Sequence, residues 1–445
     1  MLCRRGPEPY PGGSAHRLDV SRTGAGPEVL LRVQVGALMN RHGWLVRLTA
    51  GLVASMLAGS VLAGCTSPGP PPSPSPSASP SPSASPSPSF SDAEAISSLE
   101  YAMQTFMDQD AVAVLAQLRW PGGEWSKAYG VRDLDTRQPA RPQDRVPVSS
   151  VTKTMTAVSV LKLVDDGLIA LDDPVNGLLE SFGVGLKPPV PITLRQLLSQ
   201  TSGMPDYRDV MIRSLEDFVS ASSQGLTTPQ ALRLAGTLPW EARTVGLFQY
   251  SDSNNLALRL ILEKFRGKSY PQILRDDIIS PLGLTHTTID EDAPDAPDLI
   301  KGYVSVRGKR VTGGPVLEQL GSPLPVVVST MADVNDFMAA LFGGRVLSAN
   351  SLTEMKKVVI GPFALGLVKW SPDCGGAPRF FTKGGFLDFR TVALSSDDGR
   401  YQASMAVSPA PEPSLRAGED LVDERDLMSS QMLSALMEVQ DRLCG

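Results

Sequence analysis

Ser150 and Lys153 are the residues whose types and spacing best fit covalent chemistry. They stand three apart in the segment SSVTK, so a helix would place the hydroxyl and the ammonium on one face. Residues 150–166 are apolar nearly all round, which predicts a buried helix ending at Gly167. We expect burial to lower the pKa of Lys153 and make it a base, while the helix N-terminus favours negative charge on the serine oxygen. Such a pair predicts acyl transfer through a serine nucleophile.

Other catalytic arrangements fit the chain poorly. Ser149 is not equivalent to Ser150, because Thr152 stands three residues after it. No GxSxG segment occurs, and His286, in GLTHTT, is the one histidine outside the first 64 residues, so a Ser-His-Asp triad is not expected. We interpret His286 as structural or exposed. The three histidines and four cysteines show no metal-ligand spacing, and acyl transfer of this kind requires no cofactor.

Composition and charge indicate the kind of protein and the kind of partner that it binds. The chain has 445 residues, of which 42% are hydrophobic and 20% charged, enough for one large or two smaller globular domains. The formal net charge is −6, and no basic stripe is visible. Nucleic acid is therefore not an expected partner. A small-molecule or peptide substrate fits this composition better.

The N-terminal part has the features of an export signal. Within residues 39–64, Arg41 and Arg47 precede an apolar stretch that ends in small residues. That stretch is interrupted by Gly and Ser and is short beside the roughly 20 residues of a spanning helix, so a transmembrane segment is the weaker interpretation. The letters LAGC at 62–65 resemble a bacterial lipobox, in which Cys65 would be lipidated. The alternative is a plain cleaved signal with a chance cysteine.

The segments around this signal do not look like folded protein. Residues 1–38 are rich in Gly and Arg without periodicity, and Met39 begins a complete signal, so we interpret 1–38 as a misassigned upstream start. Residues 65–90 are almost wholly Pro and Ser after the cysteine, a composition that forms a semi-rigid spacer. The spacer supports lipidation of Cys65. These features predict an extracytoplasmic protein that is held at the cell membrane by its N-terminal lipid.

Two cysteines remain for the folded part once Cys65 is lipidated. They are Cys374 and Cys444, and an exported protein meets an oxidising compartment. A disulfide between them is one hypothesis, which would hold the C-terminal helix to the sheet. Two buried free thiols are the alternative.

The rest of the chain, residues 91–445, predicts one domain. Ser91 and Glu94 form a capping-box pattern before an amphipathic helix, and two strands, 111–120 and 124–131, follow as a hairpin. Residues 170–324 show helices and long loops, and a helix over 330–342 comes next. Strands are predicted over 363–370, 379–383, 389–395 and 402–407, and a closing helix over 420–443. Strands at both ends predict an α/β fold of the α+β type, with one antiparallel sheet built from both chain ends, flanked by helices and interrupted by a mainly helical insertion.

Five segments of the chain strengthen this interpretation by their order. They are VSSVTKTMTAVSVLKLVDDGLIALDDPV, ITLRQLLSQTSGMPDY, FQYSDSNNLALRLILEKFRGKSY with ISPLGLTHT, VVVSTMADVNDFMAALFGGR and FFTKGGFLDFR. Together they resemble the serine beta-lactamase and D-alanyl-D-alanine carboxypeptidase superfamily. The resemblance covers roughly residues 92–445 and is to the class C-like branch, which also contains esterases and D-aminopeptidases.

The resemblance implies a role for each matching residue. Ser150 would be the acylated nucleophile and Lys153 its proton partner. Tyr250 fills the tyrosine of the Tyr-x-Asn element, which acts in acylation and in protonating the leaving group. The third element, on the strand lining the cleft, is filled by Lys383, Gly384 and Gly385. The oxyanion hole would use the backbone N–H groups of Ser150 and Phe386.

The chain departs from the family pattern at three positions. Asp252 replaces the usual asparagine, and a carboxylate can accept a hydrogen bond from Lys153 but cannot donate one to a substrate carbonyl. Gly384 lacks the hydroxyl that helps hold the substrate carboxylate in relatives that hydrolyse beta-lactams, although Lys383 could still pair with it. We therefore expect weak beta-lactamase activity at most. Gln200 stands where relatives often have histidine, and we interpret it as structural.

Three functions remain open from the sequence. The favoured one is a serine hydrolase that forms an acyl-enzyme on Ser150 and acts on cell-wall D-alanyl peptides or on small esters or amides. The second is a catalytically degenerate lipoprotein that binds or senses penicillin-like ligands, which Asp252 and Gly384 make credible. The third is a structural envelope protein in which Ser150 and Lys153 are incidental.

Overall fold

The computed structural model describes residues 92–211, 226–289, 296–306, 308–313, 327–370, 376–385, 388–411 and 423–444. The chain divides into two compact units, Met1–Pro82 and Ser83–Gly445, and every described residue belongs to the second. The predictions for residues 1–38, the signal 39–64, Cys65 and the linker 65–90 therefore lie outside the described residues. So do those for Ser91, Cys374 and Phe386.

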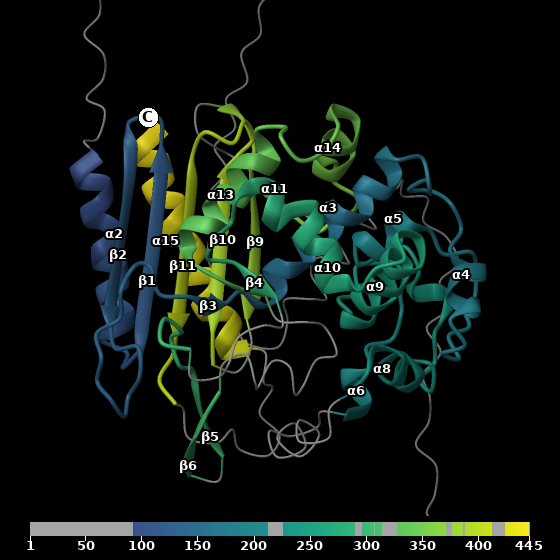
Figure 1. The fold of residues 1–445 in the computed structure, drawn as a ribbon, viewed down its shortest axis with the longest axis horizontal. Coiled ribbons are helices and arrows are strands. Elements are labelled where there is room, and N and C mark those ends of the chain that lie inside the picture. Colours follow the sequence, from purple (N-terminus) through teal and green to yellow (C-terminus); the bar gives the residue numbers. More distant parts are fainter. Residues whose placement is uncertain are drawn as a thin grey trace, which may run out of the picture. The chain divides into compact units, whose positions relative to one another are not determined.

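A six-stranded antiparallel sheet forms the centre of this second unit (Figure 1). Its strand order is β2-β1-β11-β10-β9-β8, so the N-terminal hairpin lies beside strands from the C-terminal third of the chain. This confirms the predicted sheet built from both chain ends. The strands are β1 (Ala113–Trp120), β2 (Gly123–Gly130), β8 (Val368–Trp370), β9 (Arg379–Gly385), β10 (Arg390–Ser396) and β11 (Gln402–Ser408).

Alternating side chains of β1 show how the sheet is covered on both faces. Ala113 and Leu115 belong to one apolar core, which includes the inward side of α13 (Met331–Phe342). Val114, Ala116 and Leu118 belong to a second core with α2 (Asp92–Met107) and α15 (Asp423–Cys444). A strand points successive side chains to opposite faces, so the burial of both faces of β1 agrees with its mostly apolar sequence. The predicted first, 330–342 and closing helices are all present.

Most of the remaining helices lie beside the sheet, to the right in Figure 1. Between residues 152 and 282 the structure has eight α-helices within the described ranges, and α14 follows later in the chain. They are α3 (Thr152–Asp165), α4 (Asn176–Ser181), α5 (Leu194–Leu198), α6 (Arg208–Met211), α8 (Thr228–Ala235), α9 (Asp252–Arg266), α10 (Tyr270–Leu274), α11 (Ser280–Leu282) and α14 (Ala349–Lys356).

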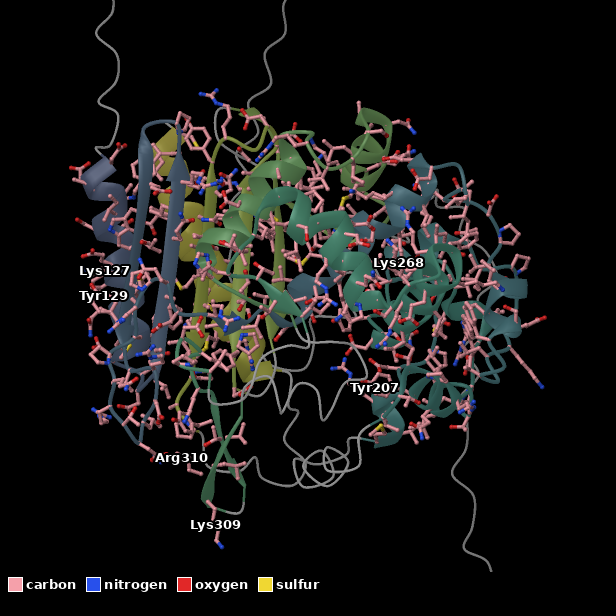
Figure 2. All side chains as sticks on the ribbon, in the orientation of Figure 1. Lys127, Tyr129, Tyr207, Lys268, Lys309 and Arg310 are labelled. Atoms are coloured by element: carbon pink, nitrogen blue, oxygen red, sulfur yellow. The ribbon has the colours of Figure 1, made fainter. Side chains whose placement is uncertain are left out.

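The last part of the predicted helical stretch contains short strands instead. Tyr303–Val306 (β5) and Lys309–Thr312 (β6) pair about Gly308, whose φ of 72° suits a tight turn. Lys309 points away from the protein at the tip of this hairpin (Figure 2). A further small sheet joins β3 (Val146–Pro147), β7 (Val327–Ser329) and β4 (Thr288–Ile289). The β-branched residues of these segments favour strands.

Helix α3 lies at the centre of the larger core. Ten of its residues are buried, including Val158 and Leu161 at 0% exposure. This confirms the predicted burial of the helix, although four of the ten buried residues are Thr or Ser. None of the described helices is long and apolar enough to span a membrane.

Candidate active site

Ser150 lies in a single 3-10 turn, Ser149–Val151, immediately before α3. The preceding Ser149 has a φ of 48°, an uncommon value for a residue other than glycine. Such backbone strain often marks a functional position. One helical turn later, Lys153 directs Nζ back to the Ser150 Oγ at 2.8 Å. The predicted neighbourhood of hydroxyl and ammonium is therefore present.

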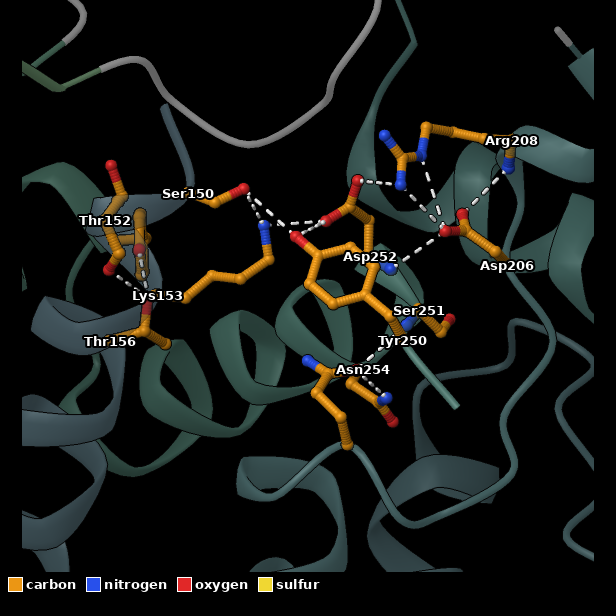
Figure 3. Close-up of polar contacts among 12 residues, drawn as sticks. Ser150, Thr152, Lys153, Thr156, Asp206, Arg208, Tyr250, Ser251, Asp252 and Asn254 are labelled. Carbon is orange, nitrogen blue, oxygen red and sulfur yellow. Dashed lines mark hydrogen bonds and ion pairs between the residues drawn. The ribbon is translucent and has the colours of Figure 1, made fainter. Parts of the chain in front are cut away.

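Tyr250, one hundred residues away in the chain, reaches the same hydroxyl, and Asp252 contacts both Lys153 and Tyr250 (Figure 3). The Tyr250 Oη lies 3.0 Å from the Ser150 Oγ, and either atom can donate. Asp252 begins α9, and its Oδ1 lies 2.7 Å from Lys153 Nζ and accepts from Tyr250 Oη at 3.3 Å. The structure thus brings together the first two sequence elements, and Asp252 does accept from Lys153 as expected.

Gln200 holds the segment that carries Tyr250. Its Oε1 accepts from the backbone N–H of Ser251 at 2.9 Å and from Asn254 Nδ2 at 2.7 Å, and its carbonyl accepts from the Gln249 N–H at 2.9 Å. Gln200 itself has a φ of 59°. These contacts agree with the interpretation of Gln200 as structural.

Arg208 and Asp206 are part of the site but escaped the sequence analysis. The Arg208 Nη2 lies 2.9 Å from Asp252 Oδ2 and 3.1 Å from Asp206 Oδ2 (Figure 3). The backbone N–H of Asp252 donates to the same Asp206 oxygen at 3.1 Å. The sequence did contain one signal for them. Position 252 carries a carboxylate where the family pattern has asparagine, and a buried carboxylate requires a neighbouring cation.

The charges of these neighbours contradict the expected low pKa of Lys153. Burial alone would lower it, but the Asp252 carboxylate and Tyr250 outweigh burial and raise the pKa of Lys153 above its ordinary value. Burial and Asp252 also raise the pKa of Tyr250. Burial acts against ionisation of Asp252 too, yet Arg208 and Lys153 lower its pKa to about 2. The free site is therefore an ionised carboxylate between two cations, with Lys153 protonated at neutral pH.

Strand β9 brings the third element to the Ser150 turn. A Cβ built on Gly384 would lie 2.3 Å from the Val148 carbonyl oxygen and 2.8 Å from the Ser150 nitrogen. Glycine is thus required here by close backbone approach. Lys383 and Gly385 flank it with exposed positions on the same strand, while Phe386, the second expected oxyanion donor, lies outside the described residues.

The remaining predicted residues lie elsewhere or are only partly described. His286 is half-exposed and faces Asp333, with Nδ1 3.7 Å from Oδ1, and takes no part in the site. Cys444 is disulfide-bonded, and Cys374, its expected partner, lies outside the described residues. Among the described residues, no group of three or more His, Cys, Asp and Glu side chains could hold a metal ion.

Comparison with known families gives this arrangement a context. A family model described as Beta-lactamase matches residues 99–420. The chain belongs to the beta-lactamase family. The match spans α2 to the strands that close the sheet, so it includes Ser150, Tyr250 and Gly384.

Solved structures support the beta-lactamase-like fold. A D-stereospecific amidohydrolase from Streptomyces sp. superposes with a TM-score of 0.63 at 23% identity, covering 76% of this chain and 98% of that one. The D-amino acid amidase from Ochrobactrum anthropi SV3, complexed with L-phenylalanine amide, gives a TM-score of 0.61 at 20% identity, covering 77% and 98%. At these identities the likeness shows the fold alone.

Curated relatives match over a shorter stretch. Protein flp of Staphylococcus aureus (strain MW2) is 27% identical over 217 residues, which is 48% of this chain and 42% of that protein. The chain thus spans less than half the length of this relative.

Proposed function

We propose that this member of the beta-lactamase family is a serine hydrolase that forms an acyl-enzyme on Ser150. One observation carries the proposal: the Ser150 Oγ lies 2.8 Å from Lys153 Nζ and 3.0 Å from Tyr250 Oη. Nucleophile and proton acceptors are within hydrogen-bond reach, as this chemistry requires. The backbone N–H groups of Ser150 and Phe386 would stabilise the oxyanion.

The reaction would proceed in two steps. The Ser150 oxygen bonds to the substrate carbonyl carbon while its proton passes to the deprotonated form of Tyr250 or Lys153. The bond to the leaving group then breaks, and the same proton goes to the departing amine or alcohol. Water attacks the acyl-serine by the reverse path and releases the acid.

The substrate class is a D-alanyl peptide of the cell wall, or a related small amide or ester. Structural likeness to proteins named as a D-stereospecific amidohydrolase and a D-amino acid amidase favours an amide next to a D-residue. Beta-lactams are weaker candidates. Gly384 contributes no hydroxyl that could help to hold the carboxylate of such a substrate.

Intact-mass spectrometry tests the acyl-enzyme directly. The full-length protein is incubated with a fluorophosphonate or, separately, with a penicillin, and Ser150→Ala is compared with wild type. Ser159→Ala is a matched control, because Ser159 is a buried serine of α3 whose Oγ has no hydrogen-bond partner in the described structure. An adduct lost only in Ser150→Ala supports the proposal. No adduct with either reagent contradicts it.

A second candidate is a binding or sensing lipoprotein that acylates without turnover. The raised pKa of Lys153 favours it, because a lysine held as a cation is a poor base. The time course of the same spectra separates the two candidates. A hydrolase loses its adduct with an activated D-alanyl ester as water releases the acid, whereas a sensor accumulates one stable adduct.

We also propose that the protein lies outside the cytoplasm, anchored to the membrane by a lipid on Cys65. The support is the signal-like segment 39–64, the LAGC letters and the Pro/Ser spacer. Membrane fractions of the wild type should contain a chain whose N-terminal fragment carries acyl mass, and Cys65→Ala should release the protein from the membrane. An unmodified Cys65 in membrane-bound protein would contradict the anchor.

A further inference from the structure

The carboxylate of Asp252 is shared between two cations on opposite sides. Its Oδ1 faces Lys153 Nζ at 2.7 Å and its Oδ2 faces Arg208 Nη2 at 2.9 Å (Figure 3). The Asp252 side chain is only 10% exposed. A buried carboxylate of this kind is stable only when it is paired and its lone pairs are used.

The position of Arg208 is set by several independent contacts. Asp206 accepts from the Arg208 backbone N–H at 3.0 Å through Oδ1, and from the Asp252 backbone N–H at 3.1 Å through Oδ2. The Tyr207 N–H donates to Ser253 Oγ at 3.0 Å. The segment before α6 is thereby tied to the start of α9. These contacts place the Arg208 backbone beside Asp252, and Asp206 Oδ2 also accepts from the Arg208 side chain, from Nη2 at 3.1 Å.

The charges of this cluster balance. Lys153 and Arg208 contribute two positive charges, and Asp206 and Asp252 contribute two negative ones. In the described part of the chain, the titratable groups facing Asp252 are Lys153 from α3, Tyr250 from the preceding segment, and Asp206 and Arg208 from the turn at α6. Without Arg208 the cluster would carry one excess negative charge beside Ser150. Negative charge must develop on the substrate oxygen there, so the excess would oppose the reaction.

We propose that Arg208 is a positioning residue of the acylation site, which neutralises Asp252 and fixes its carboxylate so that Lys153 is held against the Ser150 hydroxyl. Arg208 explains how the chain tolerates an aspartate where the family pattern has asparagine. The pair Asp252–Arg208 replaces a neutral amide by a neutral ion pair. Its role in acylation rests on the proposed serine-hydrolase function.

Electrostatics supports the same assignment. The Arg208 charge acts to lower the pKa of Tyr250 and the pKa of Asp252, against burial, which raises both. Removing the guanidinium therefore makes Tyr250 harder to deprotonate. It also raises the pKa of Lys153 further, because the negative charge of Asp252 is no longer shared with the Arg208 cation.

Four variants of the full-length protein test the proposal: Arg208→Gln, Arg208→Lys, Asp252→Asn and the double variant Arg208→Gln/Asp252→Asn. The first measurement is carboxyl ¹³C NMR of the Asp252 side chain against pH, assigned with Asp252→Asn, and it does not depend on activity. Arg208→Gln should raise the Asp252 midpoint by about one pH unit or more, as expected for loss of a cation within hydrogen-bond distance. Arg208→Lys should leave the Asp252 midpoint close to its wild-type pH, because a cation remains beside the carboxylate. An unchanged midpoint in Arg208→Gln overturns the proposal.

The second measurement is the rate of fluorophosphonate labelling at several pH values. Arg208→Gln should label about tenfold more slowly at pH 7, with its profile displaced to higher pH by about one unit. The double variant should label faster than Arg208→Gln, because removing the uncompensated carboxylate restores neutrality. Additive effects of the two substitutions would show that Arg208 does not act through Asp252. If the wild type is not labelled at all, the hydrolase function fails while the carboxyl titration still decides the role of Arg208.

Discussion

The Nζ of Lys153 lies 2.7 Å from Oδ1 of Asp252, so the candidate base of this site is one half of an ion pair. The ion pair makes the lysine harder to deprotonate than a lysine that is merely buried. Four measurable consequences follow from this relationship and from the contacts around it.

The acylation rate should rise with pH. Only the deprotonated form of Lys153 or Tyr250 can take the Ser150 proton, and the pKa of each is raised. Below these pKa values the deprotonated fraction grows about tenfold per pH unit, and the second-order rate of fluorophosphonate labelling should follow it between about pH 7 and 9. Ser150→Ala supplies the background. A profile that is flat over this range would show that neither proton limits acylation.

Acid should weaken the fold through Asp252. Its folded-state pKa is lowered from 3.8 to about 2, so its stabilisation is present above the unfolded-state value and is lost as the pH falls from about 4 toward 2. This shift in the pKa of Asp252 corresponds to about 2 kcal/mol of the free energy of unfolding. Urea unfolding at a series of pH values should show the difference between wild type and Asp252→Asn shrinking over this window. A difference independent of pH would contradict the assigned shift.

Restoring the family hydroxyl at position 384 should harm the protein. In Gly384→Thr the new Cβ would meet the Val148 carbonyl oxygen at 2.3 Å and the Ser150 nitrogen at 2.8 Å. Both are backbone atoms, so the Ser150 turn must shift and labelling should fall more than tenfold, because small misplacements of reacting groups are costly. Gly177→Ala is the control, since nothing lies within 4 Å of a Cβ there. Faster labelling in Gly384→Thr would refute the close approach.

Removing the acceptor of Gln200 should loosen the Tyr250 segment. Gln200→Met keeps the shape of the side chain but leaves the Ser251 N–H and the Asn254 amide without their shared acceptor. Unsatisfied buried donors cost about 1–3 kcal/mol, and labelling should slow as Tyr250 moves.

A glutamine outside the site provides the control that separates an effect on stability from an effect on the position of Tyr250. Gln230 completes the capping box of α8. Gln230→Met should lower the melting temperature without changing the labelling rate. If both glutamine variants slow labelling equally, Gln200 has no specific role in placing Tyr250.

Most elements of the fold could be predicted because their patterns are local. Apolar spacing and capping residues, such as Thr330 before α13, predict the strands β1, β9, β10 and β11 and the helices α2, α3, α13 and α15. The strands between residues 288 and 312 were not predicted, because they are only two to four residues long. Runs this short are too brief to show a period.

The amino-acid sequence by itself determined the pairing of Ser150 with Lys153, because residues three apart on a helix share a face whatever surrounds them. It also determined the sheet built from both chain ends, because strand-like runs stand near both ends of the folded part. Only the tertiary structure decided the charge state of the site. Arg208 and Asp252 are distant in sequence from Lys153, and electrostatic energy depends on separation in space. The pKa of Lys153 is therefore raised where the buried helix alone predicted that it would fall.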